Sequence, residues 1–204
     1  MTKQPWNKGK SVGQKKPLTT LQIKLLQKHL TEAANLRELA LFSLQIDTML
    51  RSSDLIKLKV NDILDFKGEV KEEINIQQKK TAQPHIVVLS KKTRGFIAKY
   101  IKKEKRALED WLFKSYSNRN KNNHLSYVSH WQLVKKWCKI LGIDPAEYAT
   151  HTGRRTRATM VYSDTKDPKL VMNLLGQRSL ASTTAYIGMD KEEARNIYKE
   201  KYLK

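Results

Sequence analysis

The stretch LLGQRSLASTTAYIG, residues 174–188, holds one tyrosine, Tyr186, in a run of small hydroxyl residues framed by two glycines. Gly176 stands where a helix C-terminus is expected, because glycine readily adopts the left-handed conformation that closes many helices. The pattern therefore predicts one helix over about 168–175 and another over about 179–187. These residues alone leave two interpretations of Tyr186 open: an aromatic side chain packed at a helix end, or a phenol that takes part in chemistry.

The charge of the whole chain limits the class of partner. Its 204 residues include 40 Lys and Arg but only 20 Asp and Glu, which gives a formal net charge of +20. So large an excess favours a polyanion, because neutralised phosphates release their counterions on binding. Nucleic acid is the first candidate and an acidic membrane surface is the second. The third interpretation is a well-solvated basic protein with no such partner.

Several classes of function find no support in the sequence. The chain lacks the glycine-rich patterns that bind nucleotide phosphates, and one cysteine with scattered histidines does not predict a zinc site. No apolar run reaches the roughly 18 residues that a membrane span requires. The single cysteine, Cys138, excludes an internal disulfide and favours a reducing compartment. We therefore expect no cofactor, no metal, no membrane association and a cytoplasmic location.

Periodicity predicts an α+β fold of mostly helices with a small antiparallel three-stranded sheet at one edge. Segments 72–78 and 85–89 alternate or are β-branched, which predicts a hairpin, and residues 60–64 supply a third short strand. Helical spacing of apolar residues begins near residue 20 and continues through 36–49. The remaining predicted helices cover about 91–113, 126–141, 152–162, 168–175, 179–187 and 190–202.

The same patterns predict the domain boundaries. Residues 17–204 are expected to form one domain with a C-terminal helix over about 190–202, which packs on its own domain or docks on a neighbouring copy. Residues 1–16 hold Lys8 and Lys10 and no acidic residue. This flexible basic arm is either a disordered leader or a segment that contacts phosphates.

A second stretch, HTGRRTRATMVY at residues 151–162, places His151 and Arg154 three residues apart at the start of a predicted helix. The two side chains therefore share a face. Free N–H groups at a helix N-terminus, together with a guanidinium, are suited to bind a phosphate. By itself the pattern is also that of a capped helix with surface arginines.

Four stretches follow one another along the chain: MLRSSDLIKLKVNDI, QKKTAQPHIVVLS, HTGRRTRATMVY and LLGQRSLASTTAYIG. In this order and spacing they resemble the catalytic domain of the tyrosine site-specific recombinases, the phage-integrase-like family, over residues 17–190. The resemblance implies a site-specific DNA recombinase that cuts and rejoins DNA through a covalent 3′-phosphotyrosine intermediate. It also implies a bacterial protein that acts on DNA in integration, excision or inversion.

The resemblance assigns roles to individual residues, with Tyr186 as the nucleophile and Asp54 as the acidic residue that supports the first arginine. The residues it places in the active site are Arg51, Lys80, His151, Arg154, Gln177 and Tyr186. The residues that we predict to contact DNA are Lys8, Lys10, Lys79, Arg155, Arg157 and Arg178. For Arg155 and Arg157 a solvated basic stripe is the alternative.

The chemistry of strand exchange agrees with these roles. A tyrosine oxygen that attacks phosphorus keeps the energy of the phosphodiester in a new ester bond. Two arginines can stabilise the charge on the non-bridging oxygens without a divalent metal. A lysine with a lowered pKa can protonate the departing 5′ oxygen, and a histidine can assist the phenol proton.

The chain departs from the family pattern at two points. Gln177 stands where relatives usually have His, or less often Trp, and an amide donates a hydrogen bond but cannot act as acid or base. Most relatives carry a separate core-binding domain before this match, and from residues 1–16 we expect none here. These departures support an alternative hypothesis, a catalytically weakened recombinase-fold DNA-binding protein with an accessory or architectural role.

The partners implied by the resemblance are double-stranded DNA, further copies of the chain and an accessory DNA-bending protein. Copies are expected to assemble on DNA as a dimer to tetramer.

Overall fold

A computed structural model describes residues 15–78, 84–117, 123–187 and 199 of the chain. The predicted basic arm therefore lies outside the described residues up to residue 14, as does almost all of the helix predicted over 190–202. The elements are α1 (Thr20–Glu32), α2 (Leu36–Thr48), α3 (Ser52–Leu55), α4 (Val60–Ile63), β1 (Glu73–Gln77), β2 (Pro84–Val88), α5 (Lys91–Glu104), α6 (Tyr127–Ile140), η2 (Pro145–Glu147), α7 (Thr152–Thr165), α8 (Pro168–Leu174) and α9 (Leu180–Ile187). None of the described helices is long and apolar enough to cross a membrane.

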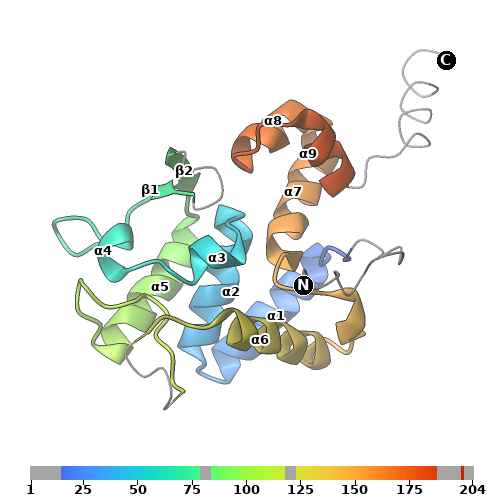
Figure 1. Cartoon of the computed structure of the whole chain (residues 1–204). Helices are drawn as coiled ribbons and strands as arrows, with labels where there is room; N and C mark the ends of the chain where they lie inside the picture. Colours follow the sequence, from blue (N-terminus) through green and yellow to red (C-terminus); the bar gives the residue numbers. More distant parts are fainter. Residues whose placement is uncertain (1–14, 79–83, 118–122, 188–198, 200–204) are drawn as a thin grey trace, which may run out of the picture.

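Helix α2 forms the centre of the main core (Figure 1). Its sequence LRELALFSLQIDT is apolar on most sides, which is the pattern of a helix surrounded by other elements. It packs against α1, α5 and α7. The side chain of Asn35 caps its first turn by accepting from the backbone N–H of Glu38 at 3.2 Å. Met49 closes it in the left-handed conformation at φ 51°, which turns the chain into α3.

The sheet of the described residues has two antiparallel strands, and the prediction of a third was wrong. Glu73 pairs with Val88 and Gln77 with Pro84, close to the predicted hairpin. Residues 60–63 form α4 instead of a strand, because the carboxylate of Asp62 accepts from the backbone N–H of Lys59 at 2.8 Å and begins a helical turn.

Helix α5 also ends earlier than the periodicity predicted. Lys105 adopts a left-handed conformation, at φ 50°, directly after Glu104. Leu112 then donates its backbone N–H to the oxygen of Leu58 at 2.7 Å, and the side chains of Leu112 and Phe113 are fully buried. Core packing and pairing with the segment around residue 58 thus replace the helical hydrogen bonds that the local sequence would allow.

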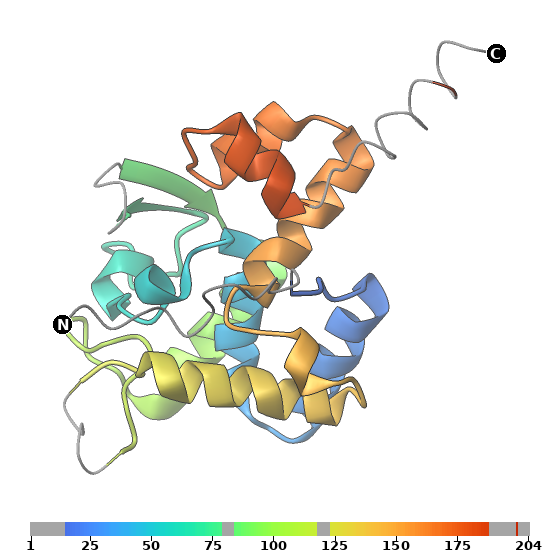
Figure 2. The same cartoon turned by 45° about the vertical axis from the view of Figure 1, so that its right-hand side comes forward.

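A second, smaller core joins the C-terminal helices to the rest of the domain. It contains Met49, Ala158, Tyr162, Val171, Leu175 and Ile187. Helix α7 therefore contributes to both cores, with its N-terminal end at α2 and its C-terminal end under α8 and α9 (Figures 1 and 2). The turn between α8 and α9 lies against the end of the hairpin, because His85 Nε2 is 3.1 Å from the backbone oxygen of Leu174.

Candidate active site

The N-terminus of α7 holds Arg154 at the junction of three elements. Arg154 is 2% exposed, and its guanidinium donates to the backbone oxygens of Met49, at the end of α2, and of Leu175, after α8. Burial lowers the pKa of Arg154 to about 10, while the nearby Tyr186 and Asp54 oppose that decrease. Since this value lies well above 7, the guanidinium stays positively charged at neutral pH.

Arg51 approaches the same turn from α3. It occupies the N-cap position of α3, is half-buried, and donates from Nη1 to Oε1 of Gln78 at 2.7 Å. Gln78 in turn donates from Nε2 to the backbone oxygen of Leu175 at 3.4 Å. The oxygen of Leu175 therefore accepts from both Arg154 and Gln78, so the two arginines are linked through one carbonyl group.

The sequence did not predict that Gln78 belongs to the site. It follows β1 and is 1% exposed, yet nothing in QQKKT distinguishes it from an ordinary polar residue beside a turn. Its neighbour across the site is Gly176, at φ 58°, where a Cβ would lie 2.5 Å from Nε2 of Gln78. A side chain at this position would be strained by the left-handed turn and would displace the amide of Gln78.

Tyr186 lies on α9 with its ring half-buried. Its hydroxyl donates to the backbone oxygen of His151 at 3.4 Å, a long hydrogen bond, and the guanidinium carbon of Arg155 is 4.7 Å from the centre of its ring. Burial raises the pKa of the phenol, and the positive charges of Arg154 and Arg155 act in the opposite direction. The phenol is therefore neutral at pH 7 and needs a base to become a nucleophile.

His151 can supply that base. Its ring keeps contact with solvent, but the atoms packed around it and the positive charges of Arg154, Arg51 and Arg155 lower its pKa from the usual 6.5. An imidazole with a lowered pKa is neutral at pH 7 and has a lone pair that can accept a proton. The positive charges of these three arginines thus disfavour protonation of His151.

Gln177 lies in the turn before α9, half-buried. Its Oε1 accepts from the hydroxyl of Thr183 at 2.6 Å, and Thr183 is fully buried. The Thr183 hydroxyl also lies 3.1 Å from the backbone oxygen of Ser179. With Oε1 facing Thr183, Nε2 of Gln177 keeps its two N–H groups as donors. This arrangement agrees with a neutral hydrogen-bond donor.

The structure thus brings together Arg51, His151, Arg154 and Tyr186, with Gln177 in the adjoining turn. Lys79 and Lys80, and likewise Lys8 and Lys10, lie outside the described residues. No group of three or more His, Cys, Asp or Glu side chains that could hold a metal ion occurs in the part of the chain that the structure describes.

The three other arginines predicted to contact DNA have different surroundings. Arg155 covers the ring of Tyr186. Arg157 forms an ion pair with Asp47, 3.0 Å between Nη2 and Oδ1, and Asp47 also accepts from the backbone N–H of Ser90 at 2.9 Å. Arg178 is exposed. DNA contact by each of them stays a prediction.

A tyrosine whose hydroxyl contacts the backbone of a histidine beside two arginines, on a mostly helical domain with a small hairpin, defines the catalytic domain of a tyrosine recombinase. The model of the phage integrase family matches residues 16–193, and the chain belongs to that family. The family predicted from the four motifs is thereby confirmed, and so is the fold class apart from its third strand.

Individual relatives are more distant. The chain is 28% identical to the probable integrase/recombinase YoeC of Bacillus subtilis over 81% of this chain and 84% of that protein. It is 28% identical to the tyrosine recombinase XerA of Saccharolobus solfataricus over 90% of this chain, but spans only 55% of that relative. The crystal structure of XerH bound to a palindromic difH substrate, a post-cleavage complex, has a TM-score of 0.73 at 19% identity, covering 93% of this chain and 54% of that one.

Proposed function

We propose that this chain is a site-specific DNA recombinase that cuts and rejoins DNA through a covalent 3′-phosphotyrosine intermediate. The observation that carries the proposal is the position of the Tyr186 hydroxyl at the N-terminus of α7, beside His151 and within the field of Arg154 and Arg155. Membership of the phage integrase family supports the same reaction. Nothing in the described residues or in the comparisons favours the alternative of a binding protein with little activity.

Each side chain has a role in the proposed cleavage. The Tyr186 oxygen attacks the phosphorus, a bond forms between them, and the bond from phosphorus to the 5′ oxygen breaks. His151 accepts the phenol proton, and Arg51 and Arg154 stabilise the negative charge on the non-bridging oxygens. Lys80 protonates the departing 5′ oxygen, a role that the approach of Gln78 to the site supports. Attack by a 5′ hydroxyl from another strand reverses these steps and rejoins the DNA.

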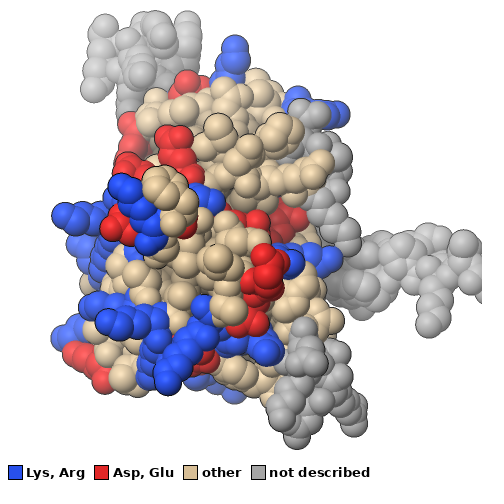
Figure 3. All heavy atoms as spheres, turned by 90° about the vertical axis from the view of Figure 1, so that its left-hand side faces the viewer, with Lys and Arg blue, Asp and Glu red and all other residues tan. Residues whose placement is uncertain are grey.

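Double-stranded DNA is the proposed substrate and partner. The net charge of +20 supports this, as do the DNA complexes among the structures with the same fold. On the face shown in Figure 3, Lys and Arg side chains gather over the lower half among fewer acidic ones. Further copies of the chain and an accessory DNA-bending protein complete the proposed assembly on bacterial DNA, in integration, excision or inversion.

The proposal extends to the parts of the chain beyond the site. Residues 17–204 act as the catalytic domain. Residues 1–16, with Lys8 and Lys10, contact the DNA backbone, and the helix over about 190–202 packs on its own domain or on a neighbouring copy. Lys79, Arg157 and Arg178 are proposed to contact phosphates.

Trapping of the covalent intermediate tests the proposal. Nicked duplexes tiled across the DNA that flanks the gene lose a short 5′-hydroxyl fragment after cleavage, which prevents rejoining. We expect an adduct that survives denaturing electrophoresis, with the nucleotide mapped to Tyr186 by mass spectrometry. Tyr186→Phe removes only the hydroxyl and serves as the control. An adduct that persists in Tyr186→Phe contradicts the assigned nucleophile, and DNA binding without adduct on every tile favours the alternative.

A further inference from the structure

A chain of buried polar groups runs behind the candidate site and joins α3, α6, α2 and the segment that leads into α7. The Ser52 hydroxyl lies 2.7 Å from Nδ1 of His130, and Nε2 of His130 lies 3.0 Å from Oε1 of Gln45. Nε2 of Gln45 donates to the backbone oxygen of Thr150 at 2.8 Å. All four residues are at most 2% exposed. We refer to Ser52, His130, Gln45 and Thr150 as the buried polar chain.

The direction of every hydrogen bond in the buried polar chain follows from the groups at its ends. The oxygen of Thr150 is only an acceptor, so Gln45 presents its amide nitrogen to it and its Oε1 to His130. His130 must then carry its proton on Nε2 and accept the Ser52 hydroxyl proton on Nδ1. Burial, with a smaller contribution from His151, lowers the pKa of His130 to about 4. The ring is therefore neutral and held in one tautomer at neutral pH.

The ends of the buried polar chain adjoin the proposed catalytic residues in the sequence. Ser52 directly follows Arg51, and Thr150 directly precedes His151. On α7, Gly153 allows the close approach, because a Cβ there would lie 2.6 Å from Cγ of Gln45. The buried polar chain thus connects the segment at Arg51 with the segment at His151. The distance between these two segments determines how Arg51 faces His151 and Arg154.

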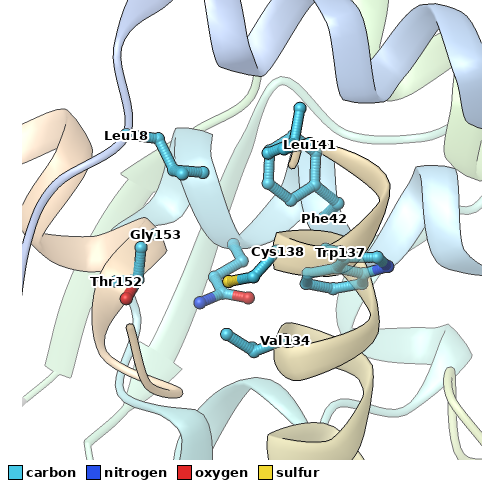
Figure 4. Close-up of a pocket in the computed structure, with 9 residues that line it drawn as sticks. Leu18, Phe42, Val134, Trp137, Cys138, Leu141, Thr152 and Gly153 are labelled. Atoms are coloured by element: carbon cyan, nitrogen blue, oxygen red, sulfur yellow. The ribbon is translucent and has the colours of Figure 1, made fainter. Parts of the chain in front are cut away.

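The surroundings leave Gln45 little room to move. Thr152 and Gly153 face Val134, Cys138 and Trp137 of α6 across a small cavity (Figure 4). The cavity measures about 10 Å³ and is lined by Gln45 as well. That volume is near the minimum that holds a single water molecule, so little free space adjoins the amide of Gln45.

We propose that Ser52, His130 and Gln45, together with Gly153, are positioning residues. They hold Arg51 and the N-terminus of α7 in the relative positions that catalysis requires. The proposal rests on the proposed function, since it concerns the same arginines and histidine. A neutral, fully hydrogen-bonded chain sets the geometry without adding a charge behind the phosphate site. Small displacements of groups that act on one phosphate cost large factors in rate, so such a support has a function beyond stability.

Imidazole NMR tests the geometry without any DNA. The chain has five histidines, so their ring nitrogens can be assigned by substitution. We expect His130 as the Nε2–H tautomer and the pKa of His151 below 6.5, set by the packing around it and by Arg154, Arg51 and Arg155. In Ser52→Ala and His130→Leu, we expect the arginines to move away from His151, so that the pKa of His151 rises toward 6.5. His130→Gln, which can still donate to Gln45 and accept from Ser52, restores a lower pKa.

A matched control separates positioning from burial. Ser43 on α2 is 1% exposed and accepts from Nε2 of Gln27 at 3.0 Å, outside the buried polar chain. Ser43→Ala removes a buried hydroxyl much as Ser52→Ala does, and we expect it to leave the pKa of His151 unchanged. If Ser52→Ala and His130→Leu also leave it unchanged while remaining folded, or if Ser43→Ala shifts it as much, the proposal is overturned.

The nicked duplexes provide the second measurement. We expect Ser52→Ala and Gly153→Ala to slow adduct formation by about tenfold or more, with DNA affinity in gel shifts within about twofold of the wild type. If DNA affinity and the rate of adduct formation fall equally, and both fall in proportion to the melting temperature, these residues act in folding only and the proposal is overturned. Absence of adduct with the wild type contradicts the proposed function instead, and the NMR experiment still decides whether the buried polar chain positions the site.

Discussion

Arg155 is the residue whose environment adds most to the proposed cleavage step. Its guanidinium lies over the ring of Tyr186, 4.7 Å from the ring centre, and its charge lowers the pKa of the phenol against the effect of burial. A cation in this position stabilises the phenolate that forms as the proton leaves. We therefore interpret Arg155 as a residue that acts on the nucleophile, whether or not it also contacts DNA.

Arg155→Ala is expected to raise the pKa of Tyr186, because a positive charge next to the phenolate is lost. The alkaline rise in the rate of adduct formation on nicked duplexes should then move to higher pH, and the rate at pH 7 should fall about tenfold. The measurement is the pH–rate profile of adduct formation. Arg178→Ala, in the neighbouring turn, is the control and should change DNA affinity without moving the profile. A profile of Arg155→Ala that coincides with the wild type contradicts this role.

Gln177 offers a second test at a single side chain. Gln177→Ala removes the amide donor and should lower the rate of adduct formation on the order of 10²-fold if the amide contacts the transition state. Gln177→His restores a titratable donor, and we expect activity at least equal to the wild type and greater below the pKa of the new imidazole. Both variants are measured by single-turnover rates on nicked duplexes between about pH 5.5 and 8. This range extends about one unit or more on each side of an ordinary histidine pKa. A wild-type rate for Gln177→Ala would show that the amide is not used.

At the scale of elements, the site depends on contact between the β1–β2 hairpin and the α8–α9 turn. Gln78 and His85 from the hairpin reach the backbone oxygens of Leu175 and Leu174. Gly176 permits that contact, because any larger side chain would meet Gln78. The hairpin thereby brings the end of β1 to the carbonyl that Arg154 also uses.

Two glycines in the same backbone conformation make this contact testable. Gly142, at φ 65°, has open space where a Cβ would be, whereas Gly176 has Gln78 there. Each substitution to Ala costs about 1–2 kcal/mol from left-handed strain. Gly176→Ala should lose more free energy of unfolding in urea than Gly142→Ala, and only Gly176→Ala should abolish adduct formation. Equal stability and equal activity of the two variants would show that the hairpin contact is dispensable.

At the scale of the whole molecule, the buried polar chain links stability to pH. His130 has a pKa of about 4 in the folded protein, below the usual 6.5 of an exposed histidine. Between these values the unfolded chain binds a proton that the folded protein does not, so the stabilisation is complete above pH 6.5 and is lost as pH falls toward 4. The loss attributable to His130 is up to about 3 kcal/mol.

Urea unfolding at pH 7 and pH 5 measures this effect. The wild type should lose free energy of unfolding at the lower pH, and His130→Gln should lose clearly less, because its side chain does not titrate. His85 and His151, whose pKa values are also lowered, contribute to both proteins equally. The same pH dependence in both proteins would contradict a neutral, buried His130.

Local patterns in the sequence determined much of this protein. The helix periods, the glycine at 176 and the order of four motifs predicted the fold class, the family and the meeting of Arg51, His151, Arg154 and Tyr186. They failed where packing overrides local preference: Val60–Ile63 begin a helix under the cap of Asp62, and α5 ends at Glu104 because Leu112 and Phe113 enter the core.

Only the tertiary structure decided which residues support the site. Gln78, Gln45 and His130 carry no local signal, since their roles come from contacts with groups far away in the sequence, such as Leu175 and Thr150. Gly153 lies inside the helix predicted over 152–162, and the reason for a glycine there is the side chain of Gln45 packed against it. A sequence encodes the period of each element directly, whereas the direction in which a buried polar group finds its partner depends on how the elements pack.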